Sequence, residues 1–359
     1  MNFEKYYKDK KILVTGHTGF KGSWLSLWLL KLGADVVGYA LDPYTSKDNF
    51  VVSGLSERME DIRGDIRDFE KFNSVVKKYK PEIIFHLAAQ AILRLSYEIP
   101  RETIETNVMG TENVLEAFRK SDSAKTLIVI TSDKCYENKE WIWGYREIDP
   151  VGGYDPYSAS KGAAEIITSA YIRSFFNPKD YKKHGKVVAT VRAGNVIGGG
   201  DWGKDRIIPD CIRSLENGKP IEVRNPDSVR PWQFVLEPLN GYLLLASKMH
   251  EDPEIFSGPW NFGPDPDSII TVKEVVEKVL KYYGKGSWIK TNDNGELHES
   301  TLLNLDTSKA RYLLKWKPKL NIDEAVKMTI EWYKNYQDND IKKIINDQIE
   351  AFMDNSGDK

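Results

Sequence analysis

The strongest indication of the fold is the segment Lys11-Ile-Leu-Val-Thr-Gly-His-Thr-Gly-Phe-Lys-Gly-Ser-Trp24. Residues 11–15 are a short apolar, β-rich run, typical of a buried parallel strand. Glycines follow at 16, 19 and 22, and residues 23–32 have helical character. A strand, a glycine turn and a helix in this order favour a dinucleotide-binding turn over a tight turn without a ligand. Glycine lets backbone amides approach a pyrophosphate, and a helix N-terminus carries partial positive charge.

The same alternation continues through the first half of the chain. Strand-like runs recur at 35–41, 82–87, 126–131 and 186–191, and the clearest helical runs are 100–119 and 157–176. Alternating strands and helices predict an α/β fold, a doubly wound (Rossmann-type) parallel sheet with helices on both faces.

After about residue 195 the pattern loosens and Gly and Pro become frequent, although 272–283 and 322–336 still look helical. We therefore expect a dinucleotide-binding domain over 1–191, rejoined by a segment near 230–262. Residues 192–359 would form mainly a smaller mixed α/β substrate domain. A ligand cleft is expected between the two.

Composition excludes several classes of protein. The 359 residues are 41% hydrophobic, which is enough for a substantial core and excludes a disordered chain. Lys+Arg 51 against Asp+Glu 53 gives a net charge of −2, without the basic footprint of a nucleic-acid-binding protein. Two cysteines, Cys135 and Cys211, and five histidines give no metal-ligand spacing, so no metal is expected. The charged N-terminus and the lack of ~20 consecutive apolar residues predict no signal peptide and no membrane span, hence a cytoplasmic protein.

Tyr157 and Lys161 are four residues apart on a predicted helix, which places both on one face. A cation near a phenol favours the phenolate and lowers a pKa that is ~10 in isolation. The Tyr-x-x-x-Lys spacing is common by chance. It gains weight from Thr131-Ser132 at the end of a predicted strand and from the glycine turn.

Together these features resemble the short-chain dehydrogenase/reductase superfamily. Further segments agree with it: Gly64-Asp-Ile-Arg-Asp68 resembles its adenine-contacting turn, His86-Leu-Ala-Ala-Gln90 its cofactor loop, and Asn107 a helix position that braces the active site. The resemblance implies a catalytic triad of Ser132, Tyr157 and Lys161, with Lys161 also holding the nicotinamide ribose. The implied cofactor-binding residues are Gly16, Thr18, Gly19, Phe20, Lys21, Gly22, Asp65, Ile66, Leu87, Ala88, Ala89, Gln90, Thr106, Thr131, Tyr157 and Lys161.

The choice between NAD and NADP depends on the end of the second strand. Asp42 is a candidate partner for a free ribose hydroxyl, although Ala40 is an alternative equivalent position. Lys21 is a possible partner for a 2′-phosphate. We favour NAD.

Two charged residues, Asp133 and Lys134, directly follow Ser132. The segments 132–147, 16–24, 192–202 and Arg230-Pro-Trp-Gln233 are similar to those of the CDP-glucose 4,6-dehydratases, and the similarity covers nearly the whole chain. It implies CDP-glucose as substrate, CDP-4-keto-6-deoxyglucose as product, NAD as cofactor and a role in making deoxysugars for surface polysaccharide such as lipopolysaccharide O-antigen. It makes Asp133 the acid for the departing carbon 6 hydroxyl. Lys134 is either the base for carbon 5 or a charged stabiliser of the enolate. An epimerase, a reductase or a dehydratase of another nucleotide sugar is the rival prediction.

The substrate's diphosphate requires Arg and amide donors. By resemblance Asn195 contacts the phosphates, with Arg206 and Arg230 as the best Arg candidates, and Glu299 is a candidate ribose contact. Arg192 and Arg224 are expected to be structural ion-pair partners. His86 and His298 are expected to be packed or solvated, and a homodimer follows by analogy with the superfamily.

Overall fold

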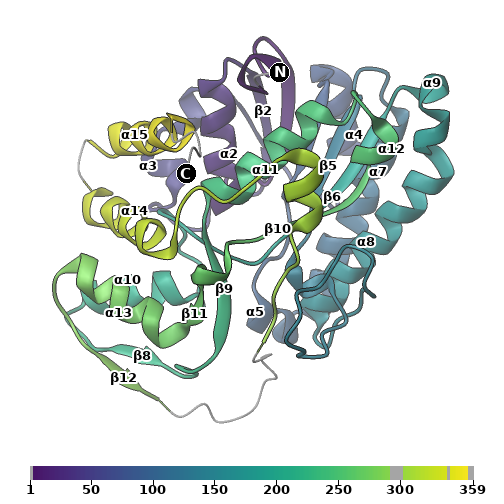
Figure 1. Cartoon of the computed structure of the whole chain (residues 1–359). Coiled ribbons are helices and arrows are strands. Elements are labelled where there is room, and N and C mark those ends of the chain that lie inside the picture. The colour runs from purple at the N-terminus through teal and green to yellow at the C-terminus, as the bar shows by residue number, and fades with distance from the viewer. Residues whose placement is uncertain (1–2, 292–301, 338–339, 355–359) are drawn as a thin grey trace.

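The computed structural model describes residues 3–291, 302–337 and 340–354. A seven-stranded sheet in the order β10-β6-β5-β4-β1-β2-β3 forms its centre (Figure 1), and every neighbouring pair in it is parallel. The predicted doubly wound sheet is thereby confirmed. Its strands are β1 (Lys11–Thr15), β2 (Asp35–Ala40), β3 (Glu60–Arg63), β4 (Ile83–His86), β5 (Thr126–Ile130), β6 (Val187–Ala193) and β10 (Gly258–Phe262).

Helices cover both faces of this sheet because its strands are apolar on both sides. Ile12 and Val14 of β1 face a core that includes α2 (Phe20–Lys31) and α11 (Leu236–Lys248). Leu13, between them in sequence, faces a second core. The helices of that second face are α4 (Phe69–Tyr79), α7 (Gly110–Lys120) and α8 (Pro156–Phe175).

The predicted helix at 100–119 differs from the structure. It is a run of α6 (Pro100–Ile104), the π-helical turn η2 (Glu105–Met109) and α7. Such π-turns are frequent at functional sites because they displace side chains from the regular spacing. Here the turn carries Asn107, which is buried.

A smaller part extends from the carboxyl edge of the sheet, at the lower left of Figure 1. It contains a three-stranded sheet, β11-β9-β7, and the parallel pair β12 and β8. Strand β10 belongs to the large sheet although it follows residue 191. The domain boundaries themselves stay a prediction. The elements are β7 (Asn195–Ile197), α10 (Ile207–Glu216), β8 (Ile221–Val223), β9 (Val229–Phe234), β11 (Ile269–Thr271), α13 (Val272–Tyr283), β12 (Trp288–Lys290) and α14 (Ile322–Asn335).

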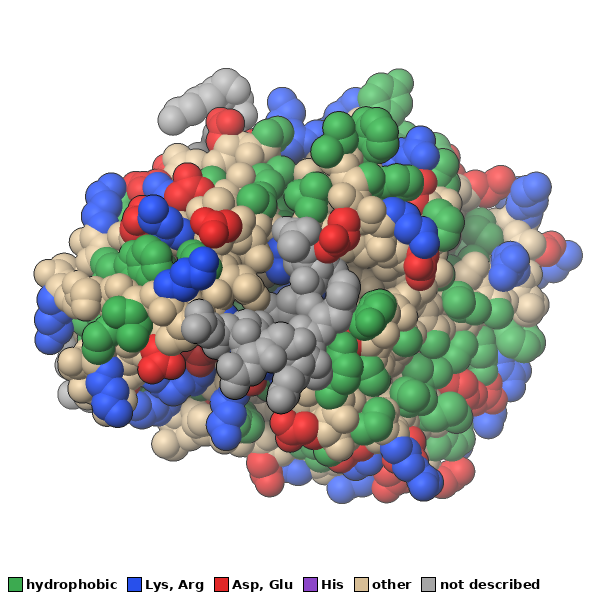
Figure 2. Space-filling model, turned by 90° about the horizontal axis from the view of Figure 1, so that it is seen from below, with side chains coloured by type: hydrophobic (Ala, Val, Ile, Leu, Met, Phe, Trp, Pro, Cys, Tyr) green, Lys and Arg blue, Asp and Glu red, His purple; other side chains and the backbone are tan. Residues whose placement is uncertain are grey.

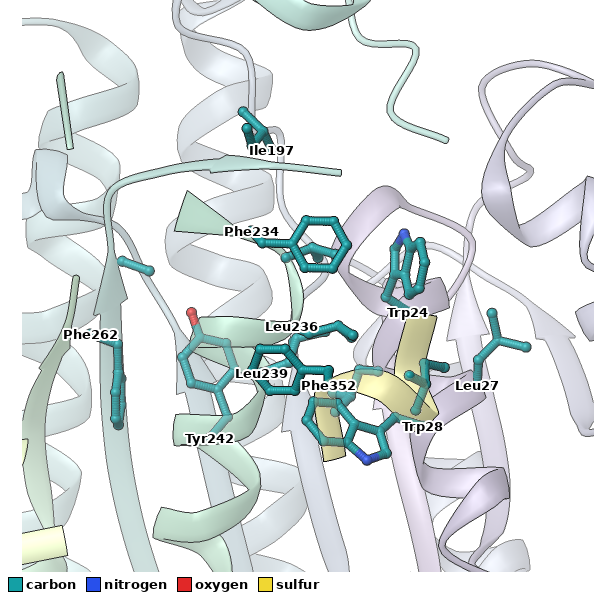
Figure 3. Packing of buried hydrophobic residues seen from close by; sticks show 14 of the residues in the cluster. Trp24, Leu27, Trp28, Ile197, Phe234, Leu236, Leu239, Tyr242, Phe262 and Phe352 are labelled. Carbon is teal, nitrogen blue, oxygen red and sulfur yellow. The ribbon is translucent and has the colours of Figure 1, made fainter. Parts of the chain in front are cut away.

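The C-terminal helix α15 (Ile341–Asp354) packs against α2, a contact that the sequence did not predict. Phe352 meets Trp28 edge to face, with ring centroids 5.6 Å apart (Figure 3). The apolar core on the α2 side of the sheet therefore includes a residue from the last turn of the described chain. Short helices complete the fold: α1 (Phe3–Tyr6), α3 (Asn49–Val52), η1 (Leu55–Glu57), α5 (Leu93–Glu98), η3 (Asp133–Cys135), η4 (Pro178–Asp180), α9 (Tyr181–His184), α12 (Pro253–Phe256), η5 (Pro266–Ser268) and η6 (Ala310–Leu314).

Two surface properties bear on the expected partners. Within the described ranges, no helix combines the length and the apolar character needed to cross a bilayer. On the coloured part of the face in Figure 2, Lys and Arg side chains are interspersed with Asp and Glu rather than gathered into one basic patch.

Candidate active site

A cleft of about 810 Å³ lies where β1, β4, β5 and β6 end, and the smaller part forms its other wall. In the sheet β1 lies between β2 and β4. The chain adds β2 and β3 on one side of β1 and then crosses over to add β4 and β5 on the other, so the strand order reverses at this point. Open α/β sheets bind ligands at such a switch point.

The glycine turn forms the floor of the cleft beside α2. Gly16 has φ +73° and its α-carbon packs against the backbone of Ala88, so a side chain there would collide with it. Gly22 packs closely on Gly16, since a Cβ added at Gly22 would lie 2.1 Å from the Gly16 carbonyl oxygen. Gly19 is the N-cap of α2, and no side chain caps the helix or places a carboxylate in its first turn. The first-turn amides thus face the cleft, which fits the pyrophosphate of a dinucleotide.

All the residues predicted to bind the cofactor line this one cleft, although they come from separate segments of the chain. Asn107 fixes the loop after β4: its Oδ1 accepts a hydrogen bond of 2.8 Å from the Gln90 amide, and its Nδ2 donates to the Gln90 carbonyl. The same Nδ2 donates to Ser160 on α8. Asn107 therefore connects this loop to the helix that carries Tyr157.

The two candidate ribose positions also lie on the cleft wall. Ala40 ends β2, and the exposed Asp42 side chain lies 3.6 Å from the Arg63 guanidinium. His86 is buried on the cofactor loop's strand, between the hydroxyls of Thr15 and Thr111, and burial lowers its pKa to about 3. It is a packed, neutral histidine, as predicted.

Tyr157 and Lys161 point into the cleft from the first turns of α8. Asp155 sets where this helix begins, because its carboxylate accepts hydrogen bonds from the Ser158 amide and hydroxyl at 2.9 and 2.6 Å. Asp155 was not among the predicted site residues, although Asp before Pro156 is a recognisable N-cap signal.

Burial dominates the ionisation of the catalytic pair. It raises the pKa of Tyr157 to about 12, against a hydrogen bond with Ser132 that lowers it. Burial lowers the pKa of Lys161 to about 8, against the negative charge of Glu165. From the four-residue spacing we expect Lys161 to favour the Tyr157 phenolate. The protein by itself favours the neutral phenol, because desolvation disfavours the charged form of either group.

Asp133 and Lys134 follow Ser132 in the turn η3, and all three line the cleft. The Ser132 hydroxyl donates to Asp133 Oδ1 at 2.9 Å and accepts a hydrogen bond from the Lys134 amide at 3.2 Å. A side chain at Gly194 would crowd both Pro231 and this carboxylate, since an added Cβ would lie 2.9 Å from Pro231 Cγ and 3.3 Å from Asp133 Oδ2. Sequence reasoning missed Gly194, whose signal was a glycine directly after the buried strand β6.

The predicted substrate residues Asn195, Arg206 and Arg230 line the far side of the same cleft. Arg206 is held by Asp201, with a 2.8 Å bond between Nη1 and Oδ2. Arg224 forms an ion pair with Asp205 and also borders the cleft. Glu299 and His298 lie outside the described residues. The individual ligand contacts remain predictions.

Comparisons with known proteins agree with this geometry. Residues 13–329 match the family model described as GDP-mannose 4,6 dehydratase. The CDP-glucose 4,6-dehydratase of Salmonella typhimurium is 51% identical over 332 residues, covering 92% of each chain. A solved dTDP-glucose 4,6-dehydratase of Bacillus anthracis in complex with NAD shares the fold, with a TM-score of 0.75 at 23% identity, over 94% of this chain and 99% of that one. Because the match spans both the sheet and the smaller part, this chain belongs to the GDP-mannose 4,6 dehydratase family.

Proposed function

We propose that this protein is an NAD-dependent hydro-lyase that converts CDP-D-glucose into CDP-4-keto-6-deoxyglucose and water. The observation that carries the proposal is the 51% identity to a CDP-glucose 4,6-dehydratase over 92% of both chains. The cleft supports it, because Ser132, Tyr157 and Lys161 share one wall with the additional pair Asp133 and Lys134.

The glycine turn, the turn at Asp65 and Ile66, and the loop at 87–90 would hold NAD across the carboxyl edge of the sheet. Held there, NAD would supply the hydride chemistry: a hydride would leave carbon 4 of the sugar for the cofactor and return to carbon 6, so no net redox change would occur. A positive charge on the bound cofactor near Tyr157 would oppose the desolvation that raises the pKa of this phenol.

The side chains of the chain itself move the protons. Tyr157 takes the proton of the carbon 4 hydroxyl, while Ser132 orients that hydroxyl by a hydrogen bond. The resulting ketone acidifies the hydrogen on carbon 5. Asp133, acting as a neutral acid, then gives its proton to the departing carbon 6 hydroxyl, which leaves as water. The group that took the carbon 5 proton returns a proton to carbon 5 as the hydride reaches carbon 6. The proton held by Tyr157 passes to the Asp133 carboxylate, so that each group ends the cycle in its starting state.

Lys134 has two possible roles in the elimination. As a neutral amine it would take the carbon 5 proton, and as an ammonium it would stabilise the enolate after another group takes that proton. Its place next to Asp133 on the cleft wall suits either role.

The substrate's diphosphate would lie against Asn195, Arg206 and Arg230. The ion pair with Asp201 holds Arg206 at the cleft wall before a ligand binds, which reduces the entropy lost on binding. Glu299 is retained as a candidate ribose contact.

A homodimer is proposed as well. Large apolar side chains are exposed along α6, η2 and α8: Ile104 is 47% exposed, Met109 50% and Ile166 56%. These helices pack side by side on one face of the sheet, and pairing with the same helices of a second copy would cover them. Light scattering on the wild-type protein and on Ile166→Glu tests this, since only the variant should be monomeric. The protein is further proposed to be cytoplasmic and to supply deoxysugars for surface polysaccharide such as O-antigen.

A substrate screen tests the function. The protein is incubated with NAD and separately with the CDP, dTDP, UDP and GDP sugars, without added reductant, and products are weighed by mass spectrometry. We expect loss of one water from CDP-glucose and a 4-keto product that absorbs in alkali. Epimerisation without loss of water, or dehydration confined to another nucleotide sugar, would overturn the assignment.

A further inference from the structure

A buried carboxylate, Glu165, lies one helical turn beyond Lys161 on α8. Its side chain is 5% exposed and faces Arg192 of β6, which is 3% exposed. Arg192 Nε and Nη2 each donate to one of the two carboxylate oxygens at 2.9 Å. Thr131 donates to Oε1 at 2.5 Å and Thr190 to Oε2 at 2.6 Å. The carboxylate therefore has four partners and is fully satisfied.

Both members of the pair keep their charges in this setting. Burial alone would raise the pKa of Glu165, but the charge of Arg192 and the hydrogen bonds from Arg192, Thr131 and Thr190 outweigh it and lower the pKa. A buried ion pair of this kind contributes little net stability, because the desolvation of two charges offsets their attraction. The contribution of this ion pair therefore lies in the structural elements that it connects rather than in stability.

The pair joins three elements that carry the active centre. Glu165 is fixed to α8, which carries Tyr157 and Lys161. Thr131 directly follows β5 and precedes Ser132, so the 2.5 Å bond ties the Ser132 backbone to the helix. Arg192 lies two residues before Gly194, where an added Cβ would lie 3.3 Å from Asp133 Oδ2.

Arg192 also reaches the segment after the catalytic turn. Its guanidinium lies 4.6 Å from the centroid of the Tyr136 ring, and Nη1 donates to the Glu147 carbonyl at 3.4 Å. Neither Glu165 nor Arg192 is among the described residues that line the cleft. Any effect of the pair on the reaction must therefore act through its neighbours.

We propose that Glu165 and Arg192 are positioning residues, which hold α8, β5 and β6 in the register that brings Tyr157, Ser132 and Asp133 to the same substrate. The pair is not a catalytic group, and its role in dehydration rests on the proposed function. A displacement of about 1 Å between reacting groups can cost ~10²-fold in rate, so a flexible substitute should impair turnover even in a stable protein.

The decisive variant is the double substitution Glu165→Leu with Arg192→Met. It removes both charges together and fills the space with apolar atoms, so no buried charge is left unpaired. We expect a melting temperature at or above that of the wild type, a kcat for CDP-glucose at least tenfold lower, and KM and NAD affinity within threefold of the wild-type values. Thr190→Val is the matched control, because it removes one hydrogen bond from the same carboxylate on a strand that does not carry Ser132. Its kcat should stay within threefold.

A kcat within twofold of wild type in a stable double variant would overturn the proposal. If the double variant does not fold, Arg192→Lys is measured instead. Lysine keeps the positive charge but cannot form the two parallel hydrogen bonds that the guanidinium donates to the carboxylate. Reduced kcat at an unchanged melting temperature supports a positioning role, and full activity excludes it. Failure of the proposed function is separate, because it would appear as wild-type protein that does not dehydrate CDP-glucose. The same variants would then be compared on the nucleotide sugar that the wild type accepts.

Discussion

The two glycines Gly19 and Gly22 give a prediction that separates cofactor binding from folding. In Gly22→Ala the new methyl group would lie 2.1 Å from the Gly16 carbonyl oxygen and 2.7 Å from its carbon. Ordinary contacts there are 3.4 Å or more, so the turn and α2 must move apart by about an ångström. Overpacking of this kind costs about 1–3 kcal/mol.

In Gly19→Ala the backbone has no such conflict. The residue has φ −77° and ψ 171°, which alanine adopts freely, and the only close neighbour of its Cβ would be the Gly16 oxygen at 3.3 Å. The methyl group would otherwise project into the cleft, over the amides that begin α2. It should therefore keep a pyrophosphate away without disturbing the fold.

We expect Gly22→Ala to lower both the melting temperature and the affinity for NAD. Gly19→Ala should melt within about 2 °C of wild type, yet bind NAD at least tenfold more weakly, a loss of about 1.4 kcal/mol. Thermal melts without nucleotide and calorimetric titration with NAD measure the two effects separately. If Gly19→Ala binds NAD as tightly as wild type, the turn does not cradle the pyrophosphate and the placement of the cofactor is wrong.

Three further predictions concern protons. Tyr157→Phe should lower kcat by roughly 10²–10⁴-fold while NAD titrates as in wild type, because the variant lacks only the proton acceptor; near-normal turnover would refute its role. Lys134→Met should abolish solvent deuterium exchange at carbon 5 if Lys134 is the base, and unchanged exchange assigns the base elsewhere. Glu237 is 1% exposed and burial raises its pKa to about 8. Its folded form therefore keeps a proton that the unfolded chain loses near pH 4.5, so the stability it contributes is full below that pH and falls as pH rises toward 8. Urea unfolding at pH 5 and pH 8 should show this loss of stability in wild type and a smaller loss in Glu237→Gln. If the free energy of unfolding falls equally in both proteins, other groups cause the loss.

The fold class and the identity of the main chemical groups could be predicted from the amino-acid sequence alone. Each signal was local: an apolar run before a glycine turn, a helix whose spacing puts Tyr157 and Lys161 on one face, and a charged pair after Ser132. Such patterns fix secondary structure and neighbours three or four residues apart, because backbone geometry alone relates them. The helix at 272–283 has the same bounds in the structure, since Thr271 and Glu274 form a capping box.

The hydrogen bonds and ion pairs between distant segments, in contrast, depend on the three-dimensional packing. Three such arrangements bring together residues that are far apart in the chain. They are the hydrogen bond from Asn107 in the π-turn to Ser160, the ion pair of Glu165 with Arg192, and the placement of Gly194 close to Asp133. The ionisation of Tyr157 also differed from the local expectation, because its pKa responds first to burial and only then to the charges nearby. Burial is a property of the packed molecule, since every element that covers a side chain contributes to it, and no pattern within a short stretch of sequence specifies it.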